Sequence, residues 1–240
     1  MKFAARINRV QPSPTLAITA KAKAMIADGI DVVSFGAGEP DFDTPVSVRN
    51  AASAALEAGH TRYTAADGIS PLRKAIAADY KRRGREVSMD QVIVGVGGKH
   101  ALYNATQVLF EAGDKVIIPA PYWVSYPAQV LLADAEPLTV QTGPDSDFRL
   151  APEQLRELLA ADESIRGFIL CSPSNPTGSV YSAEELRELG KVLIDYPNVI
   201  TFFDAMYDRL CYDEEIAADF AAVNPELADR TVTFNGFSKT

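Results

Sequence analysis

An indole, an amide, a carboxylate and an amine each follow a short apolar run in this sequence of 240 residues. Trp123 comes after KVIIPAP, Asn175 lies in SPSNPTG after GFILC, Asp204 ends VITFFD, and Lys239 comes after TVTFNGFS. Runs of this length are typical of buried strands, and ligands of open α/β sheets collect at the carboxyl ends of the strands. Such side chains could together bind a ligand and act on it.

Several of these positions also have a simpler structural explanation. Gly97, Gly98 and Lys99 open a helical segment, where free N–H groups favour an anion, but a tight strand-to-helix turn would also need glycine. The sequence contains neither G-x-G-x-x-G nor G-x-x-x-x-G-K-[ST]. Trp123 could stack on a flat ligand or pack as a core or interface aromatic. Asp204 could pair with a cation or cap a short helix over AMYDRLCY.

The remaining candidate residues indicate a function only when they are considered together. Asn175 lies in an irregular loop with two prolines and a glycine, which is more elaborate than a plain turn requires. Most lysines are solvated, so Lys239 alone gives little reason to expect reactivity. With the phenol of Tyr207, the set fits a flat, phosphorylated, aromatic cofactor whose ring nitrogen pairs with an acid and whose aldehyde reacts with an amine. Pyridoxal phosphate (PLP) has these features.

The elements that must position these residues alternate along the chain. Apolar runs predict strands at residues 91–96, 114–119, 135–140, 166–171, 198–204 and 230–235. Helical spacing lies between most of them, for example over 98–113, which ends at a glycine. Ser70 is a predicted N-cap before Pro71, and Ser182 with Glu185 predicts a capping box. This alternation predicts an α/β fold with a mainly parallel sheet.

Composition and the N-terminal region limit the possible functions. The net charge is −9, which argues against nucleic-acid binding, and no apolar run is long enough to span a membrane. The first residues do not form a secretory signal, and Cys171 and Cys211 are predicted to be buried, reduced thiols of a cytoplasmic protein. Residues 1–45, with a helical stretch at 15–28 and a loop rich in Gly, Pro and Asp, are predicted to form an arm beside the main domain.

Seven segments together resemble one protein family. They are PSPTLAITAKAKAMIADGIDVVSFGAGEPDFDTP, TRYTAADGISPLRKAIA, VGVGGKHALYN, APYWVSYP, SPSNPTG, FFDAMYDRL and NGFSKT. In this order and spacing they resemble the class I aminotransferases of the PLP-dependent fold type I group, especially bacterial aspartate aminotransferases. The resemblance implies a three-layer α/β/α large domain, here over residues 46–240 and incomplete at the C-terminus.

The resemblance also implies a role for each motif residue. Lys239 would form the Schiff base with PLP, with Ser238 nearby, and Asp204 would pair with the ring N–H. Asn175 and Tyr207 would bond the phenolic oxygen of the cofactor. Gly98 and Lys99 would bind the cofactor phosphate, and Tyr63 would reach the phosphate in a neighbouring subunit. Trp123 would stack on the ring. Gly38 would contact the substrate carboxylate, with Trp123 and Asn175 also near the substrate.

The implied activity is transfer of an amino group between an amino acid, aspartate or glutamate, and a 2-oxo acid. Lys239 would act first as the Schiff-base amine and then as the base that moves the proton of the substrate Cα. The reaction would be ping-pong, in a cytoplasmic homodimer with no nucleic acid, metal or membrane. Gln11 stands where some relatives that accept prephenate carry a lysine, which argues mildly against that substrate.

The sequence departs from the family pattern in two places. Ala205 follows Asp204 where the family often has Glu, and the sequence stops one residue after Lys239, before two arginines and the small C-terminal domain that the family supplies. We therefore expect a fragment with weak activity or none. The alternatives are a non-catalytic PLP-binding or dimerising remnant, and another fold type I activity such as a lyase or decarboxylase. A PLP-binding transcriptional regulator is disfavoured, because the resemblance starts near residue 10.

Overall fold

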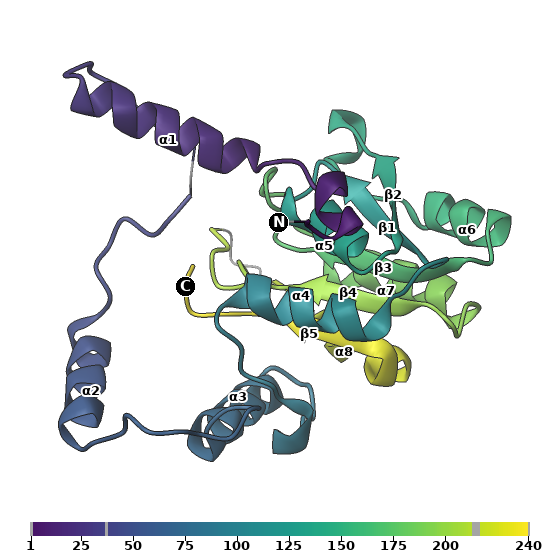
Figure 1. Ribbon diagram of the computed structural model, residues 1–240. Coiled ribbons are helices and arrows are strands. Elements are labelled where there is room, and N and C mark those ends of the chain that lie inside the picture. The colour runs from purple at the N-terminus through teal and green to yellow at the C-terminus, as the bar shows by residue number, and fades with distance from the viewer. Residues whose placement is uncertain (1, 37, 213–216, 240) are drawn as a thin grey trace.

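A parallel five-stranded sheet forms the centre of the molecule in a computed structural model, which describes residues 2–36, 38–212 and 217–239 (Figure 1). Its strands are β1 (Lys115–Ala120), β2 (Glu136–Gln141), β3 (Ile165–Cys171), β4 (Ile200–Asp204) and β5 (Thr231–Phe234). Their order across the sheet is β2-β1-β3-β4-β5, and every neighbouring pair is parallel. All five carboxyl ends therefore lie at one edge, as the sequence predicts for the last five apolar runs.

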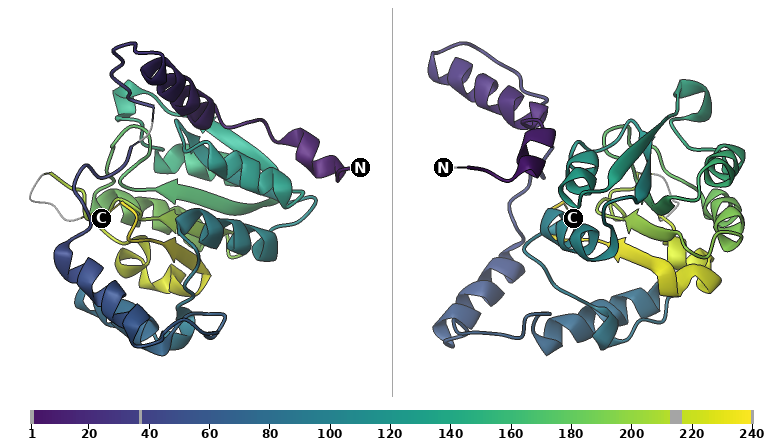
Figure 2. Two further views of the ribbon diagram at one scale, coloured as in Figure 1. Left: turned by 60° about the vertical axis from the view of Figure 1, so that its left-hand side comes forward. Right: turned by 45° about the vertical axis from the view of Figure 1, so that its right-hand side comes forward.

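Helices cover both faces of this sheet, which gives the predicted three layers (Figure 2). The α-helices of the described residues are α1 (Pro14–Ala27), α2 (Val46–Glu57), α3 (Ser70–Arg82), α4 (Gly98–Leu109), α5 (Ser125–Leu132), α6 (Pro152–Ala161), α7 (Ala183–Ile194) and α8 (Phe220–Val223). Short 3-10 helices are η1 (Ala5–Arg9), η2 (Met89–Gln91), η3 (Pro144–Ser146) and η4 (Pro225–Arg230).

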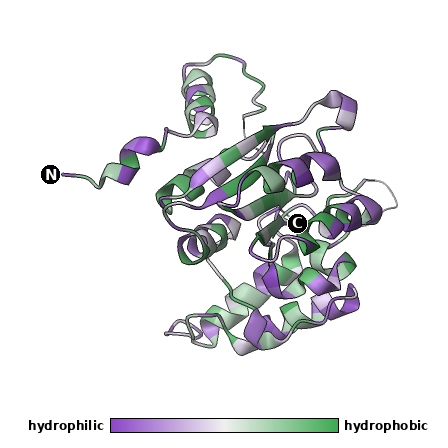
Figure 3. Cartoon of the chain, turned by 90° about the vertical axis from the view of Figure 1, so that its right-hand side faces the viewer, coloured by the Kyte–Doolittle hydropathy of each residue, from purple (hydrophilic) through white to green (hydrophobic). Residues whose placement is uncertain are grey.

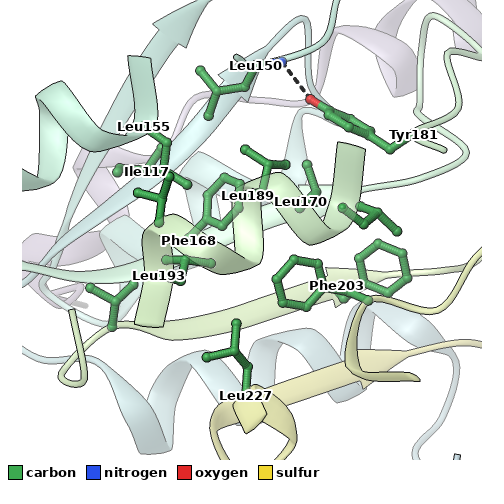
Figure 4. Packing of buried hydrophobic residues seen from close by; sticks show 14 of the residues in the cluster. Ile117, Leu150, Leu155, Phe168, Leu170, Tyr181, Leu189, Leu193, Phe203 and Leu227 are labelled. Carbon is green, nitrogen blue, oxygen red and sulfur yellow. Dashed lines mark hydrogen bonds between the residues drawn. The ribbon is translucent and has the colours of Figure 1, made fainter. Parts of the chain in front are cut away.

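The core is divided by the sheet, because successive side chains of a strand point to opposite faces. Phe203 of β4 packs with residues of α6, α7 and α8, whereas its neighbour Phe202 packs with residues of α4 and α5. Figure 4 shows the first of these clusters, in which Leu189 and Leu193 of α7 meet Phe168 of β3. Strands covered on both faces require continuous apolar runs, which is why these runs stand out in the sequence.

The N-terminal 60 residues have a different character. No residue of η1, α1 or α2 is buried, and in Figures 1 and 2 α1 and α2 extend away from the sheet. The short helix η1 lies against α5, and Arg9 pairs with Asp134, which follows α5. Coloured by hydropathy in Figure 3, the extended helices carry apolar residues without a covering layer. The division into 1–45 and 46–240 stays a prediction.

Three local predictions about elements are wrong. Residues 91–96 form no strand in the described structure, because their backbone meets no strand partner: Val94 N–H bonds to Asp67 O, and Ile93 and Val96 are exposed. The helix at 98–113 ends at Leu109, because Phe110 is extended. Ser70 lies inside α3, whose N-cap is Ile69.

One other local prediction is confirmed, and the one about the cysteines holds only in part. The capping box of α7 is present, since Ser182 Oγ accepts from Glu185 N at 3.2 Å and Glu185 Oε2 accepts from Ser182 N at 2.8 Å. Both cysteines are free thiols but half-buried, not buried. In the part of the chain that the structure describes, no helix is long and apolar enough to cross a membrane.

Candidate active site

The predicted site residues lie where the chain leaves the carboxyl ends of four parallel strands. Trp123 follows β1, Asn175 follows β3, Asp204 ends β4, and Lys239 follows β5. Backbone bonds fix these exits relative to one another: Ser172 N donates to Asp204 O at 3.1 Å, and Ala205 N donates to Phe234 O at 2.8 Å. The chain also reverses direction across the sheet at β1, with β2 on one side and β3 on the other, and ligands of α/β sheets bind near such switch points.

Asp204 is a buried carboxylate at the centre of this edge, 4% exposed. Its Oδ2 accepts a hydrogen bond from Tyr126 Oη at 2.6 Å, and its Oδ1 accepts one from Met206 N at 3.1 Å. Burial raises the pKa of Asp204, and these two hydrogen bonds oppose that rise. The alternative that Asp204 caps a helix is wrong, because a turn and not a helix follows it.

Asn175 and Tyr207 meet beside Asp204. The Asn175 amide nitrogen lies 3.1 Å from Tyr207 Oη, to which it donates a hydrogen bond. Burial raises the pKa of Tyr207, so its phenol stays protonated at neutral pH, and the bond from Asn175 opposes this rise. Both side chains are half-buried, which leaves them accessible to a ligand.

The start of α4 approaches the end of β4. Gly97 has φ 80° and ψ 163°, a conformation that is essentially restricted to glycine. A Cβ on Gly98 would lie 2.3 Å from Met206 Cε, so glycine permits the close approach of helix and turn. Gln129 Nε2 donates to Lys99 O at 3.1 Å and ties the first turn of α4 to α5. The first N–H groups of α4 are thereby held beside the end of β4, and the N-terminus of a helix favours an anion.

Trp123 lies between two polar groups of the site. Its ring has Lys99 Nζ 5.0 Å from the centroid and Tyr126 edge-on at 5.5 Å between centroids. The indole is half-buried and packs partly against the core cluster of α4 and α5. Trp123 therefore packs partly with the core, and its half-buried ring also has the Lys99 amine over it, whereas stacking on a ligand stays a prediction.

The remaining predicted residues are Lys239, Gly38, Ser238 and Tyr63, and they differ in exposure and in contacts. The amine of half-buried Lys239 donates a hydrogen bond to the carbonyl oxygen of Gly38, so that two predicted residues 201 positions apart meet. Ser238 is exposed, and its hydroxyl lies 3.9 Å from the sulfur of Met206. Tyr63 is fully exposed and lies apart from this cluster, and its role in a neighbouring subunit stays a prediction.

Tyr126 and Met206 belong to the site but were not identified from the sequence. Tyr126 lies in the first turn of α5, three residues after Trp123, and this short separation is the signal that could have indicated a common location. Met206 touches the start of α4 and the loop after β5 only because two glycines, Gly98 and Gly236, leave room for it. That arrangement depends on tertiary packing, which no local pattern specifies.

The chain belongs to the family described as "Aminotransferase class I and II", whose profile matches residues 30–240. Members of this family depend on PLP. The structure is similar to the crystal structure of an aspartate aminotransferase from Rhizobium meliloti, with a TM-score of 0.94 and 41% identity, over 100% of this chain and 60% of that one. The family and the fold type predicted from the sequence are thus confirmed.

Curated relatives show the same likeness. The chain is 48% identical over 232 residues to an aspartate/prephenate aminotransferase of Cereibacter sphaeroides. The matched region is 96% of this chain and 58% of the relative. It is 43% identical over 241 residues to an aspartate aminotransferase of Bacillus subtilis, which covers 100% of this chain and 61% of the relative. The chain therefore spans about three-fifths of the length of these relatives.

Proposed function

We propose that this chain carries the cofactor site of a PLP-dependent aminotransferase that moves an amino group between aspartate or glutamate and a 2-oxo acid. The observation that carries the proposal is the buried carboxylate of Asp204, at the sheet edge where the loop of Lys239 also lies. The substrate pair rests on the names of the relatives, of which some include prephenate and others do not.

The residues present fit PLP. In the described part of the chain, Asp204 forms no ion pair, and its hydrogen-bond partners are a phenol and a backbone N–H, so this buried acid lacks a positive partner. A protonated ring nitrogen would supply that partner, and a buried acid without one is costly. When bound, PLP supplies an aldehyde that reacts with amines and a ring that withdraws electrons from the substrate Cα.

The side chains of this site would then divide the work. Asp204 would hold the proton on the ring nitrogen, and Tyr126 would keep Asp204 ionised. Asn175 and Tyr207, already bonded to one another, would orient the ring through its phenolic oxygen. Trp123 would stack on the ring.

Anion binding and proton transfer fall to other groups. The N–H groups of Gly98 and Lys99 would bind the phosphate at the positive end of α4. The amine of Lys239 would bind the aldehyde carbon and later accept the proton from the substrate Cα. Gly38, whose carbonyl oxygen accepts from Lys239, would contact the substrate carboxylate through its backbone.

Three further features belong to the same proposal. We place the protein in the cytoplasm as a homodimer, in which Tyr63 of one chain serves the site of the other. Residues 1–45 would form an arm and 46–240 the larger part of the cofactor domain. The exposed apolar residues Phe35, Phe42 and Tyr63 fit surfaces that a second copy would cover.

The test uses the 240-residue chain with PLP, reduction by borohydride, and peptide mapping by mass spectrometry. We expect the pyridoxyl group on Lys239 and its loss in Lys239→Ala, whereas Lys191→Ala, at an exposed lysine bonded to Glu188, should leave labelling unchanged. Labelling scattered over exposed lysines would contradict the proposed site. Amino-group transfer, measured beside ammonia and CO₂ release in the protein that contains this chain, separates a transaminase from a lyase, a decarboxylase or a non-catalytic remnant.

A further inference from the structure

Asp208 is a second buried carboxylate, four residues after Asp204, and it is not part of the site described above. The side chain of Asp208 is 2% exposed, and its Oδ2 has two partners that are distant in sequence. Arg83 Nη2 lies 2.7 Å from it, and the Asn235 side-chain amide donates to it at 2.7 Å. Its Oδ1 is also buried and has no hydrogen-bond partner among the described residues. One oxygen atom therefore joins the end of α3 to the chain after β5.

Both the nitrogen and the oxygen of the Asn235 side-chain amide form hydrogen bonds. Its nitrogen donates to Asp208, and its Oδ1 accepts from the backbone N–H of Gly236 at 2.7 Å. The amide thus bridges the buried acid and the first peptide after β5, four residues before Lys239. Gly236 is further confined by Met206, because a Cβ there would lie 3.2 Å from Met206 Cε.

Arg85 adds a second connection from the same segment. Its Nη1 bonds to Thr233 Oγ1 of β5 at 2.6 Å and lies 3.4 Å from Asp219 Oδ1. The guanidinium groups of Arg83 and Arg85 lie 5.8 and 5.4 Å from the ring centroid of Tyr80. Cation–π contacts of this kind hold the planar groups in place. The segment after α3 is therefore bonded to β5 through Arg85, and to the loop after β5 through Arg83 and Asp208.

We propose that Arg83, Asp208 and Asn235 are positioning residues that hold the loop 235–239, and with it the amine of Lys239, at the carboxyl edge of the sheet. The inference rests on the proposed function, because it gives Lys239 the cofactor-binding role. Among the described residues, no hydrogen bond or ion pair joins these three side chains to a predicted cofactor residue, although Asp208 directly follows Tyr207 in the chain. We expect them to act through the backbone from Asn235 to Lys239. A hydrogen bond to a buried charge is among the stronger ones, so its loss should release the loop measurably.

The first experiment measures hydrogen exchange of amides 236–239 in the Asn235→Ala chain without any ligand. Asn224→Ala is the matched control, because Asn224 is a buried asparagine whose amide donates to Leu186 O at 3.1 Å and Phe220 O at 3.0 Å, away from the loop. We expect exchange within 236–239 to rise most at the Gly236 amide, which donates to Asn235 Oδ1, by roughly 10- to 100-fold in Asn235→Ala, the equivalent of a lost bond to a charged group. Asn224→Ala should leave the ratio of exchange at 236–239 to exchange in β3 unchanged.

The second readout is the chemical reactivity of Lys239, followed by reductive methylation with formaldehyde. In Asn235→Ala we expect Lys239 to react several-fold faster and its borohydride-trapped PLP label to fall. In the double variant Arg83→Met with Asp208→Asn, the amide oxygen introduced at position 208 still accepts from Asn235, and no buried charge is left unpaired. Both readouts should therefore lie closer to the unmodified chain than in Arg83→Met alone.

The outcomes separate the two proposals. If Lys239 takes no PLP label in the unmodified chain, the proposed function fails, yet exchange at 236–239 still tests the loop. If Lys239 is labelled and Asn235→Ala alters exchange and reactivity no more than Asn224→Ala does, the positioning role is overturned. A double variant that behaves like Arg83→Met alone would also contradict it, because the bond from Asn235 would then carry no part of the effect.

Discussion

Replacing Tyr126 by Phe removes one hydroxyl from the interior and leaves the ring in place. Tyr126 is 2% exposed, and its hydroxyl donates to Asp204 Oδ2 at 2.6 Å. Burial raises the pKa of Tyr126 well above 10, so this hydroxyl is a neutral donor at every pH considered below. The substitution therefore tests how far one hydrogen bond keeps a buried carboxylate charged.

The magnitude follows from the charge of the acceptor. A hydrogen bond to a charged group contributes about 1.5–3 kcal/mol, which corresponds to a rise of about one to two units in the pKa of Asp204. The pKa of Asp204 in the folded chain is already above its ordinary value of 3.8 because of burial. The folded state therefore keeps its proton to higher pH than the unfolded state. Stability falls as pH rises through the folded pKa, and the variant should extend that fall.

The assay is urea unfolding of both chains at pH 4 and pH 8. We expect Tyr126→Phe to lower the free energy of unfolding by about 1.5–3 kcal/mol at pH 8 and by clearly less at pH 4, where Asp204 is closer to protonation. Tyr181→Phe is the matched control: Tyr181 is 4% exposed, and its hydroxyl accepts from the neutral Leu150 N–H at 2.7 Å. Its loss of about 0.5–1.5 kcal/mol should not change with pH. Equal losses for Tyr126→Phe at both pH values would refute the reasoning.

Two further predictions concern single side chains away from the site. Gly190→Ala would stabilise an ordinary helix interior by about 1 kcal/mol, but here the Cβ would lie 2.0 Å from Asn224 Oδ1. We therefore expect a net loss of about 1–3 kcal/mol, measured by thermal unfolding, and a higher melting temperature would contradict the predicted clash. At the surface, hydrogen bonds from Lys115 and Ser164 lower the pKa of Asp162 to about 2, so its contribution to stability is present above pH 3.8 and is lost as pH falls toward 2. Lys115→Met should return this pKa toward 3.8 in a carboxyl-carbon NMR titration, and an unchanged value would exclude the ion pair as its cause.

The sheet was predictable from the sequence because its strands are buried on both faces. A run such as GFILC must be apolar at every position when Phe168 and Ile169 enter opposite core clusters. The run QVIVGV is also mostly apolar but has no strand partner in the described structure, and Ile93 and Val96 remain exposed. An apolar run indicates that a segment can form a buried strand. Whether it does so depends on whether the fold places another strand beside it.

The site was predictable at the level of strand ends and not at the level of contacts. The position of Asp204 at the end of an apolar run indicated a buried acid at the sheet edge. Its partner Tyr126 comes from α5, on one face of the sheet, so their contact depends on how that helix packs. The bond between Asn175 and Tyr207 likewise joins two loops 32 residues apart, and no local spacing specifies it.

Asp204 and Asp208 show why the residue type alone does not identify a site. Both are buried acids: Asp204 is the last residue of β4, and Asp208 lies in the turn that follows this strand. Asp208 faces Arg83 and the amide of Asn235, so its charge is compensated within the chain. Asp204 faces a phenol and a backbone N–H, which bond a carboxylate but do not neutralise it. An uncompensated buried charge is a reason to expect a cationic ligand, whereas a compensated one is a reason to expect a fixed loop. The difference between the two acids therefore supports both proposals: a protonated ring nitrogen at Asp204, and a positioned lysine loop at Asp208.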